Sequence, residues 1–176
     1  MNSHSVVTTT WGEWKKLHPD TKVLSLNTGH QRNYDEGNAY KDYFATDQLM
    51  FNVPKEDTRL KNKDEVLIIR AEGYKDDPLA ISAEYLKFHK VYHDEIAGNK
   101  FVVVTDKSGA NRVYDSGNHK FKKLVNGEVK DSEGVLWKVT EEQLIAPDGR
   151  KIERLPYHRM FWFAWFNTYE NTRLVR

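Results

Sequence analysis

The chain has 176 residues, and its 27 Lys and Arg side chains nearly balance 26 Asp and Glu side chains, giving a formal net charge of +1 at pH 7. This balance argues against a broad nucleic-acid surface, which needs a concentrated positive field, so no nucleic-acid partner is expected. The sequence contains no Cys, which excludes disulfides and zinc–thiolate sites, and no apolar run approaches the roughly 20 residues of a transmembrane helix.

The first third of the chain combines one short helix with a long irregular segment. Thr10 and Glu13 form a capping-box pattern that predicts a helix ending before Pro19, and residues 21–26 follow with a strand pattern. Residues 27–64 form a long aromatic-rich loop with at most one helical turn, near residues 40–44. We expect its aromatic side chains to be pinned onto the body: Tyr34, Tyr40, Tyr43, Phe44 and Phe51. Such a long loop favours an interaction surface.

The middle of the chain reads as a series of strands. The apolar run at residues 65–72 predicts a buried strand, with its partner at residues 79–81. Ser82 is placed to cap a short helix over residues 83–88. An antiparallel meander is expected over residues 91–114, and tight-turn signals separate two further strands, at residues 120–125 and 135–139.

The last part of the chain carries a second capping-box pattern, which predicts one helical turn at residues 140–143. Two short strand segments follow around a Pro-Asp-Gly turn, then a helix over the aromatic run 161–166 and a terminal strand at residues 172–175. Hairpins link most of the strands. The sequence therefore predicts an α+β fold, a mainly antiparallel sheet with short helices, in a single domain over residues 1–176 whose sheet and C-terminal aromatic helix occupy residues 65–176.

Two stretches far apart in the chain share one pattern. Trp11 and Trp14 stand three residues apart, as do Trp162 and Trp165, and a Thr follows seven positions after the second Trp in each copy. A basic residue and two aliphatic residues come next in both. We interpret each copy as a helix–turn–strand unit that packs on the sheet, with approximate internal symmetry between the two.

With these pieces in order, the chain resembles the bacterial and archaeal domain-of-unknown-function family numbered 3179. The matching residues are Thr10–Trp14, His18–Ser25, Thr28, Gly29, Arg32, Tyr34, Asp57, Arg59, Leu60, Lys63, Val66, Arg154–Pro156, His158, Arg159, Phe161–Trp165 and Thr172. The resemblance implies no established activity. Because members are often exported, it implies an extracytoplasmic location, although residues 1–5 are polar and show no signal-peptide pattern.

The chain departs from this family in two ways. Members are typically longer and carry a Cys-Pro-x-Cys segment in an upstream half, whereas this sequence has no Cys and has Asp106-Lys107-Ser108-Gly109 after the corresponding strand. Residues 1–26 resemble the tail of an upstream repeat unit. The resemblance therefore implies that the chain is the C-terminal portion of a larger protein, with the missing upstream domain as one possible partner.

His89, His93 and Asp94 form the densest group of possible metal ligands. Histidines four residues apart share a face only on a helix, and the Val-Tyr pair between them favours a strand. On a strand, His89 and His93 share one face while Asp94 lies on the other. The alternative interpretation is a set of polar surface residues at the start of a strand.

Two further groups are candidates for ligand binding. Arg154, His158 and Arg159 precede the aromatic helix, where the arginines could bind a carboxylate or phosphate. Alternatively, these arginines stack on aromatic rings and pair with buried carboxylates. Asp57 and Arg59, beside the long loop, indicate a binding or partner role, with a solvated charged loop as the alternative.

Two functions from different classes follow. The first is a non-enzymatic binding or structural module, whose long aromatic segment meets a protein partner and which needs no cofactor. The second is a metal-dependent enzyme or metal-binding protein that uses a divalent metal at the histidine cluster. The sequence has no nucleophile elbow, phosphate-binding glycine loop or His-Glu-x-x-His pattern that would favour a particular enzyme class.

Overall fold

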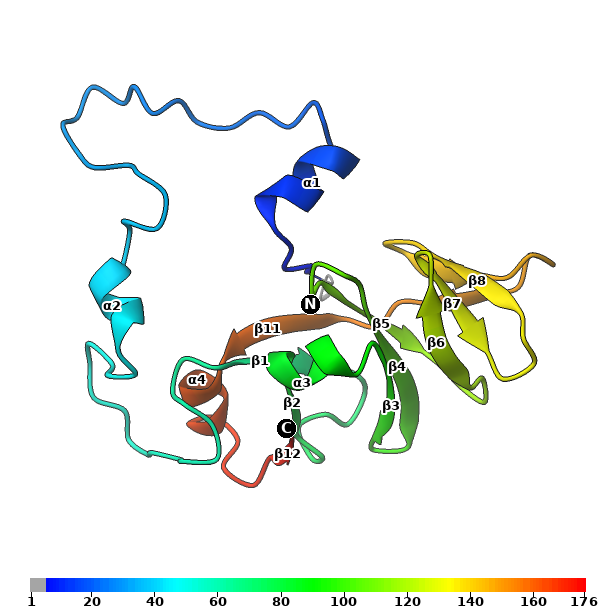
Figure 1. The fold of residues 1–176 in the computed structure, drawn as a ribbon. Coiled ribbons are helices and arrows are strands. Elements are labelled where there is room, and N and C mark those ends of the chain that lie inside the picture. The colour runs from blue at the N-terminus through cyan, green and yellow to red at the C-terminus, as the bar shows by residue number, and fades with distance from the viewer. Residues whose placement is uncertain (1–5) are drawn as a thin grey trace.

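The computed structural model describes residues 6–176 (Figure 1). Within this range it contains twelve strands in three sheets, together with four short helices. Antiparallel pairing dominates, so the predicted mainly antiparallel α+β fold is confirmed at this level. None of the described helices is long and apolar enough to cross a membrane.

The central sheet has four strands in the order β11-β1-β2-β12. Its members are β1 (Glu65–Ile69), β2 (Leu79–Ser82), β11 (Tyr157–Phe161) and β12 (Arg173–Val175). Strand β1 is antiparallel to both its neighbours, whereas β12 runs parallel to β2. The middle and last thirds of the described chain therefore meet in one sheet.

Strand β1 is buried on both faces, which explains its continuous apolar sequence. Leu67 and Ile69 face a core cluster that includes Leu86 of the helix α3 (Ala83–Phe88). Val66 and Ile68 face a second cluster, which holds both tryptophans of the helix α4 (Trp162–Phe166). Helices α3 and α4 thus cover opposite faces of the central sheet.

A meander of three strands packs beside α3: β3 (Val91–Ile96), β4 (Asn99–Thr105) and β5 (Asn111–Asp115). Alternate residues of β4 face two different cores, with Phe101 and Val103 toward the central sheet and Val102 and Val104 toward the third sheet. This meander, predicted over residues 91–114, is confirmed. It joins the two ends of the molecule.

The third sheet is a five-stranded meander at the far end of the body (Figure 1). The fully buried Trp137 is its largest core side chain, and its indole N–H donates to the Asp131 carboxylate at 2.9 Å. Positive φ angles at Asn126 and Gly127 confirm the predicted tight turn. The strands are β6 (Phe121–Val125), β7 (Glu128–Asp131), β8 (Leu136–Val139), β9 (Gln143–Ile145) and β10 (Lys151–Glu153).

Two predicted helix caps are present, and one predicted helical turn is wrong. Thr10 accepts a hydrogen bond from the Glu13 N–H at the start of α1 (Trp11–Leu17), and Ser82 accepts one from the Tyr85 N–H. At Thr140 the hydroxyl instead accepts the N–H of Gln143 and donates to its carbonyl. The same side chain that could cap a helix closes a turn here, because Gln143 already begins β9.

The strand predicted at residues 21–26 is also wrong. This stretch forms no strand, and Val23 and Leu24 are 69% and 95% exposed. A strand is defined by a hydrogen-bonded neighbour, and the described part of the chain provides none here. The sequence pattern indicates a tendency to form a strand, but it does not show whether a neighbouring strand is available.

The segment before β1 lies almost wholly outside the core: none of its described residues is buried, and only Val7 and Leu60 pack against the core clusters, as partly buried side chains. Figure 1 shows it rising through α1, arching away from the body and returning through α2 (Lys41–Ala45). The helical turn predicted near residues 40–44 is therefore confirmed. The expectation that every aromatic side chain there is pinned down is wrong, because Tyr34 and Tyr40 are 41% and 68% exposed.

Candidate functional site

The C-terminal Trp motif, residues 161–175, is built into the body. Trp162 and Trp165 are 0% and 3% exposed, on the core cluster of the central sheet. The Trp165 indole N–H donates to the Thr172 hydroxyl at 2.8 Å, and that hydroxyl reaches the Pro78 carbonyl at 3.1 Å. These bonds fix the turn that delivers β12 to the edge of β2.

Asp57 and Arg59 clamp this motif from outside. The Asp57 carboxylate accepts the indole N–H of Trp162 at 3.2 Å and the Nε–H of Arg59 at 2.9 Å. The Arg59 guanidinium lies over the Trp162 and Phe166 rings, 5.1 and 5.5 Å from their centroids, and donates to the Thr172 carbonyl. Both residues thus tie the end of the long loop to α4.

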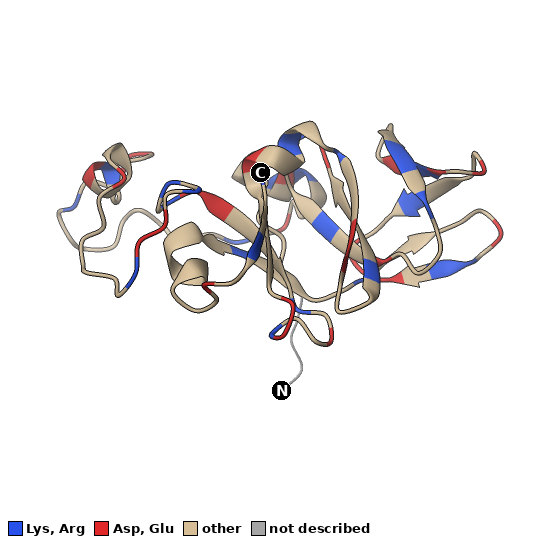
Figure 2. Ribbon diagram, turned by 90° about the horizontal axis from the view of Figure 1, so that it is seen from below, with Lys and Arg blue, Asp and Glu red and all other residues tan. Residues whose placement is uncertain are grey.

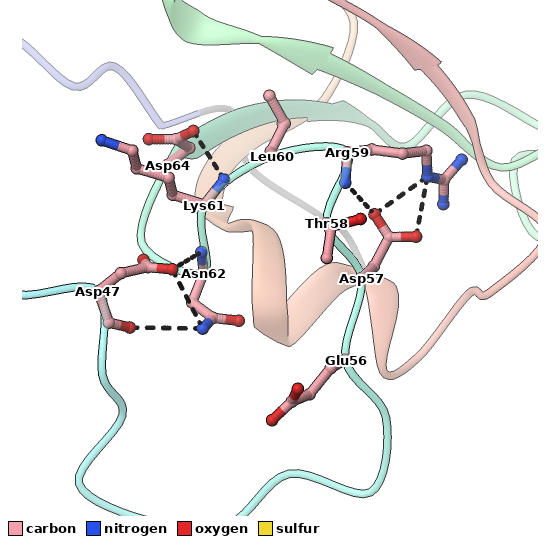
Figure 3. A pocket seen from close by; sticks show the side chains of 9 residues that line it. All are labelled: Asp47, Glu56, Asp57, Thr58, Arg59, Leu60, Lys61, Asn62 and Asp64. Carbon is pink, nitrogen blue, oxygen red and sulfur yellow. Dashed lines mark hydrogen bonds and ion pairs between the residues drawn. The ribbon is translucent and has the colours of Figure 1, made fainter.

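Beside this clamp is an open hollow of about 520 Å³ (Figure 3). Two of its acidic side chains, Asp47 and Asp64, hold the loop itself. Asp47 accepts the backbone N–H groups of Asn62 and Lys63, and Asp64 accepts that of Lys61. The hollow is lined by Asp47, Glu56, Asp57, Thr58, Arg59, Leu60, Lys61, Asn62 and Asp64. Asp47 and Asp64 are therefore loop scaffolding, and Asp57 belongs to the clamp.

The N-terminal Trp motif, residues 10–24, makes its own indole bond but has no sheet beneath it. The Trp14 indole N–H donates to the Thr21 hydroxyl at 2.9 Å, as in the C-terminal copy. However, Trp11 and Trp14 remain 51% and 40% exposed. The motif is formed locally and presents its aromatic face outward.

Exposed apolar side chains gather in the same part of the molecule. Among the described residues, the exposed large hydrophobic side chains all lie between Val6 and Phe51, apart from Phe88 and Leu136. Two of them reach the body at their edges, since the Phe44 ring contacts Phe161 and the Phe51 ring contacts Phe163. The remainder form an apolar surface along a segment with no core of its own.

Charges are interspersed over the ribbon in Figure 2, with Lys and Arg among Asp and Glu.

Lys63 illustrates how the basic residues near the long loop are used. Its ammonium group lies 3.6 Å from the centroid of the Tyr43 ring and donates to the Thr46 carbonyl at 2.7 Å. This contact holds α2 against the end of the loop.

The structure does not bring His89, His93 and Asp94 together. His89 ends α3, where its ring stacks on Tyr85 with centroids 3.7 Å apart. His93 and Asp94 are consecutive in β3 and therefore point to opposite faces. In the described part of the chain, no group of three or more His, Asp or Glu side chains could hold a metal ion.

His93 and Asp94 each have structural partners. The His93 Nε2 atom lies 3.0 Å from the Phe121 backbone N, and burial lowers the pKa of this imidazole. Burial opposes ionisation of Asp94, but hydrogen bonds from Tyr92 and Arg173 outweigh it and hold its pKa below the usual value. The Arg173 bond, 2.6 Å long, links β3 to β12.

Arg154, His158 and Arg159 do not gather at the start of α4. His158 and Arg159 lie within β11 on opposite faces of the sheet, and burial lowers the pKa of His158, helped by Arg70. The Arg159 side chain pairs with Glu65 at 3.0 Å and donates to the Asn111 side chain. These contacts join the central sheet to the β5 strand.

Arg154 belongs to a separate polar network that the sequence reading missed. Glu141 accepts hydrogen bonds from Arg154 at 2.9 Å and from the buried Arg112 at 2.8 Å, and Arg112 also pairs with Asp106 at 3.0 Å. Burial opposes ionisation of Asp106, but the hydrogen bonds that it accepts from Ser108 and Arg112 hold its pKa below the usual value. The available signal was Arg112, a charged residue inside a predicted strand.

Comparison with known proteins adds one assignment. The model of the family described as "Protein of unknown function (DUF3179)" matches residues 1–172. The chain belongs to the DUF3179 family. The resemblance read from the sequence is thereby confirmed, whereas neither the curated proteins nor the solved structures contain a match.

The DUF3179 match covers the N-terminal Trp motif, the clamp, and the C-terminal Trp motif as far as Thr172. In this DUF3179 chain, Asp57 and Arg59 support α4 from the loop side, while Arg154 and Arg159 support β11 from the body side. Asp57, Arg59, Arg154 and Arg159 therefore lie around one element pair, α4 with β11, whereas the candidate metal-binding histidines lie at α3 and β3. These contacts do not involve the segment before residue 57.

Proposed function

We propose that this DUF3179 chain is a binding or structural module and that residues 6–64 carry its partner-binding surface. The observation that supports this most is the contrast in burial. No described residue before Val66 is buried. The segment nevertheless carries large apolar side chains, and at least 40% of each is exposed at Trp11, Trp14, Leu24 and Tyr40. Exposed apolar surface of this extent marks interaction sites in soluble proteins.

The way the segment is held also supports the proposal. Its last part is fixed to the body through the Asp57–Arg59 clamp and through Lys63 at α2. Its earlier part, between α1 and α2, has mostly short-range hydrogen bonds such as the one joining Thr28 and Tyr34. The segment is thus anchored at its C-terminal end, while the part between α1 and α2, called the arm below, exposes apolar side chains. This arrangement suits a module that binds a protein surface.

The two Trp motifs refine this proposal. In our interpretation they are equivalent units with approximate internal symmetry, and both pack on sheets. The C-terminal motif packs on the central sheet of this chain, and the N-terminal motif packs on the partner. No contact among residues 6–176 favours the metal-dependent alternative, since His89, His93 and Asp94 are separately engaged.

Photo-crosslinking tests the proposed surface. A photoreactive phenylalanine analogue at Tyr40 reports on the arm, and the same analogue at Leu136, which is 37% exposed in the third sheet, is the matched control. In cells that produce the protein, we expect a discrete crosslinked species from position 40 and none from position 136. Equal yields at the two positions, or no adduct at position 40, would contradict the proposed surface.

A further inference from the structure

The two Trp motifs begin in the same backbone conformation. Thr10, the N-cap of α1, has φ −78° and ψ 152°, and Phe161, the N-cap of α4, has φ −73° and ψ 147°. Each helix then starts with the first Trp of its motif, Trp11 or Trp162. The motifs therefore share their entry angle although only Thr10 has a capping side chain.

The turns that follow the helices share a backbone hydrogen bond at the motif Thr, although α1 has seven residues and α4 has five. The Thr21 N–H donates to the His18 carbonyl at 3.2 Å, and the Thr172 N–H donates to the Tyr169 carbonyl at 3.2 Å. The rings of His18 and Tyr169 lie 4.1 and 4.4 Å from the second Trp of their motifs, at interplanar angles of 33° and 37°. With the shared indole bond, one substructure occurs twice.

Only the C-terminal copy shows what this substructure packs against. Its strand β12 pairs in parallel with β2, so that Leu174 lies opposite Ala80. The Pro78 carbonyl receives both the Thr172 hydroxyl and the Arg173 N–H, at 3.1 and 2.9 Å. The seat of this motif is therefore the side of β2 that faces away from β1, where the Pro78 carbonyl accepts both bonds next to an apolar sheet face.

Carboxylates complete that seat. Asp57 accepts the indole N–H of Trp162, and Asp94 pairs with Arg173 at 2.6 Å. The N-terminal copy has Trp11 at the position of Trp162 and Lys22 at the position of Arg173. Lys16 pairs with Glu13 in α1 at 2.8 Å, and Lys15 adds a further positive charge, so a surface that receives this copy gains from carboxylates at its edge.

We propose that the N-terminal Trp motif docks by parallel strand addition onto an edge strand of a partner β-domain built like the central sheet, with carboxylates beside that edge. The exposed Val23 and Leu24 would then occupy the positions that Leu174 and Val175 hold here. The seat in this chain is filled, since β2 is paired on both sides, so a second copy is not the expected occupant. This inference rests on the proposed function and names its partner chemistry.

A segment graft within the full chain tests whether the N-terminal motif fits such a seat. Residues 162–175 are replaced by the sequence of residues 11–24, which has the same length and keeps Trp and Thr in register. We expect the grafted chain to unfold cooperatively. The indole N–H at position 162, which the graft and the control below share, should exchange at least about tenfold more slowly in the graft, because a buried bonded N–H exchanges only on local opening.

The matched control is the same graft carrying Trp165→Ala and Thr172→Ala. It removes the indole bond and the second ring but keeps the remaining grafted sequence. If the graft unfolds no more cooperatively than this control, the proposal is overturned. The same holds if neither the graft nor the control folds. This outcome depends only on the motif and the seat, so it leaves the crosslinking test at Tyr40 unaffected.

A second measurement identifies the seat directly. The photoreactive analogue is placed at Val23 of the full chain, and the crosslinked peptide is sequenced. We expect a peptide from an edge strand with a neighbouring Asp or Glu in another domain. A peptide from a helix, from a loop or from a second copy of this chain overturns the inference. In that case an adduct at Tyr40 would still support the binding function.

Discussion

Thr172 joins three parts of the structure through one hydroxyl group. It accepts the indole N–H of Trp165 and donates to the Pro78 carbonyl, and it is 3% exposed. Thr21 makes the equivalent indole bond in an exposed position. The two residues thus place the same chemistry in two environments, which allows the energetic effect of the sheet to be measured.

The Thr172→Val variant is expected to lose about 1–3 kcal/mol of unfolding free energy. Valine preserves the shape, but it leaves the buried indole N–H without its acceptor. Urea unfolding followed by Trp fluorescence measures the change. The matched variant Thr21→Val should change the free energy of unfolding by no more than about 0.5 kcal/mol, because water replaces the lost bond. Equal losses in the two variants would contradict the assigned difference in burial.

The imidazole of His93 makes stability depend on pH. Burial lowers its pKa below the ordinary value of 6.5, so the folded state binds a proton less readily than the unfolded state. Stability is therefore full above pH 6.5 and falls as the pH drops toward the lowered folded pKa, below which the contribution is lost. His158, whose pKa is also lowered, adds to the same trend.

The His93→Gln variant tests this pH dependence. Glutamine keeps an acceptor near the Phe121 N–H but does not titrate, so the decline in stability below pH 6.5 should become shallower. Urea midpoints measured at several pH values give the slope. The control is His30→Gln, on the exposed loop, which should keep the wild-type slope. An unchanged slope in His93→Gln would show that this imidazole is not buried.

The sequence located several of these residues but not their partners. The Trp-to-Thr spacing was visible, and it corresponds to a real bond in both copies. Pairings between distant residues, such as Asp57 with Trp162, depend on the fold and leave no local pattern. The same holds for His93, whose partner Phe121 lies on another sheet.

At the scale of elements, local chemistry was predictable wherever it decides the structure. The caps at Thr10 and Ser82 and the turn at Asn126-Gly127 require only neighbouring residues, and the structure contains all three. Residues 21–26 have the composition of a strand but no neighbour to pair with. An element whose stability comes from a distant partner cannot be assigned from its own sequence.

Removal of residues 1–39 tests which elements carry the stability. Among described residues, the shortened chain loses the hydrogen bond from the Val6 N–H to the Tyr157 carbonyl and the partly buried Val7, which packs against a core cluster, but no fully buried residue. We expect it to unfold cooperatively and to lose no more than about 1–2 kcal/mol. Calorimetry of both chains measures this loss.

Trp165→Ala in the full chain is the comparison for that deletion. It removes one buried ring from the core cluster on the central sheet and should cost about 3–5 kcal/mol. A deletion that destabilises the protein more than this single substitution would show that the N-terminal segment is part of the core.

At the scale of the whole molecule, three sheets share interleaved cores while one third of the chain lies outside them. The class of fold followed from the sequence because hairpin signals connect most strands. The parallel pairing of β12 with β2 did not, since it joins residues about ninety positions apart in the chain. Nor did the exposure of the segment before β1, because its aromatic content resembles that of a packed loop.

Hydrogen–deuterium exchange of the isolated chain, read by mass spectrometry, tests the central division of the molecule most directly. The amides of β1 and β4 should exchange only on global unfolding, because both strands lie in the core with neighbours on each side. The amides of residues 22–40 should exchange close to the unprotected rate, which leaves this segment available to a partner. If residues 22–40 were as protected as β1, their amides would already be hydrogen-bonded and packed within the chain. That result would contradict the proposed role of this segment.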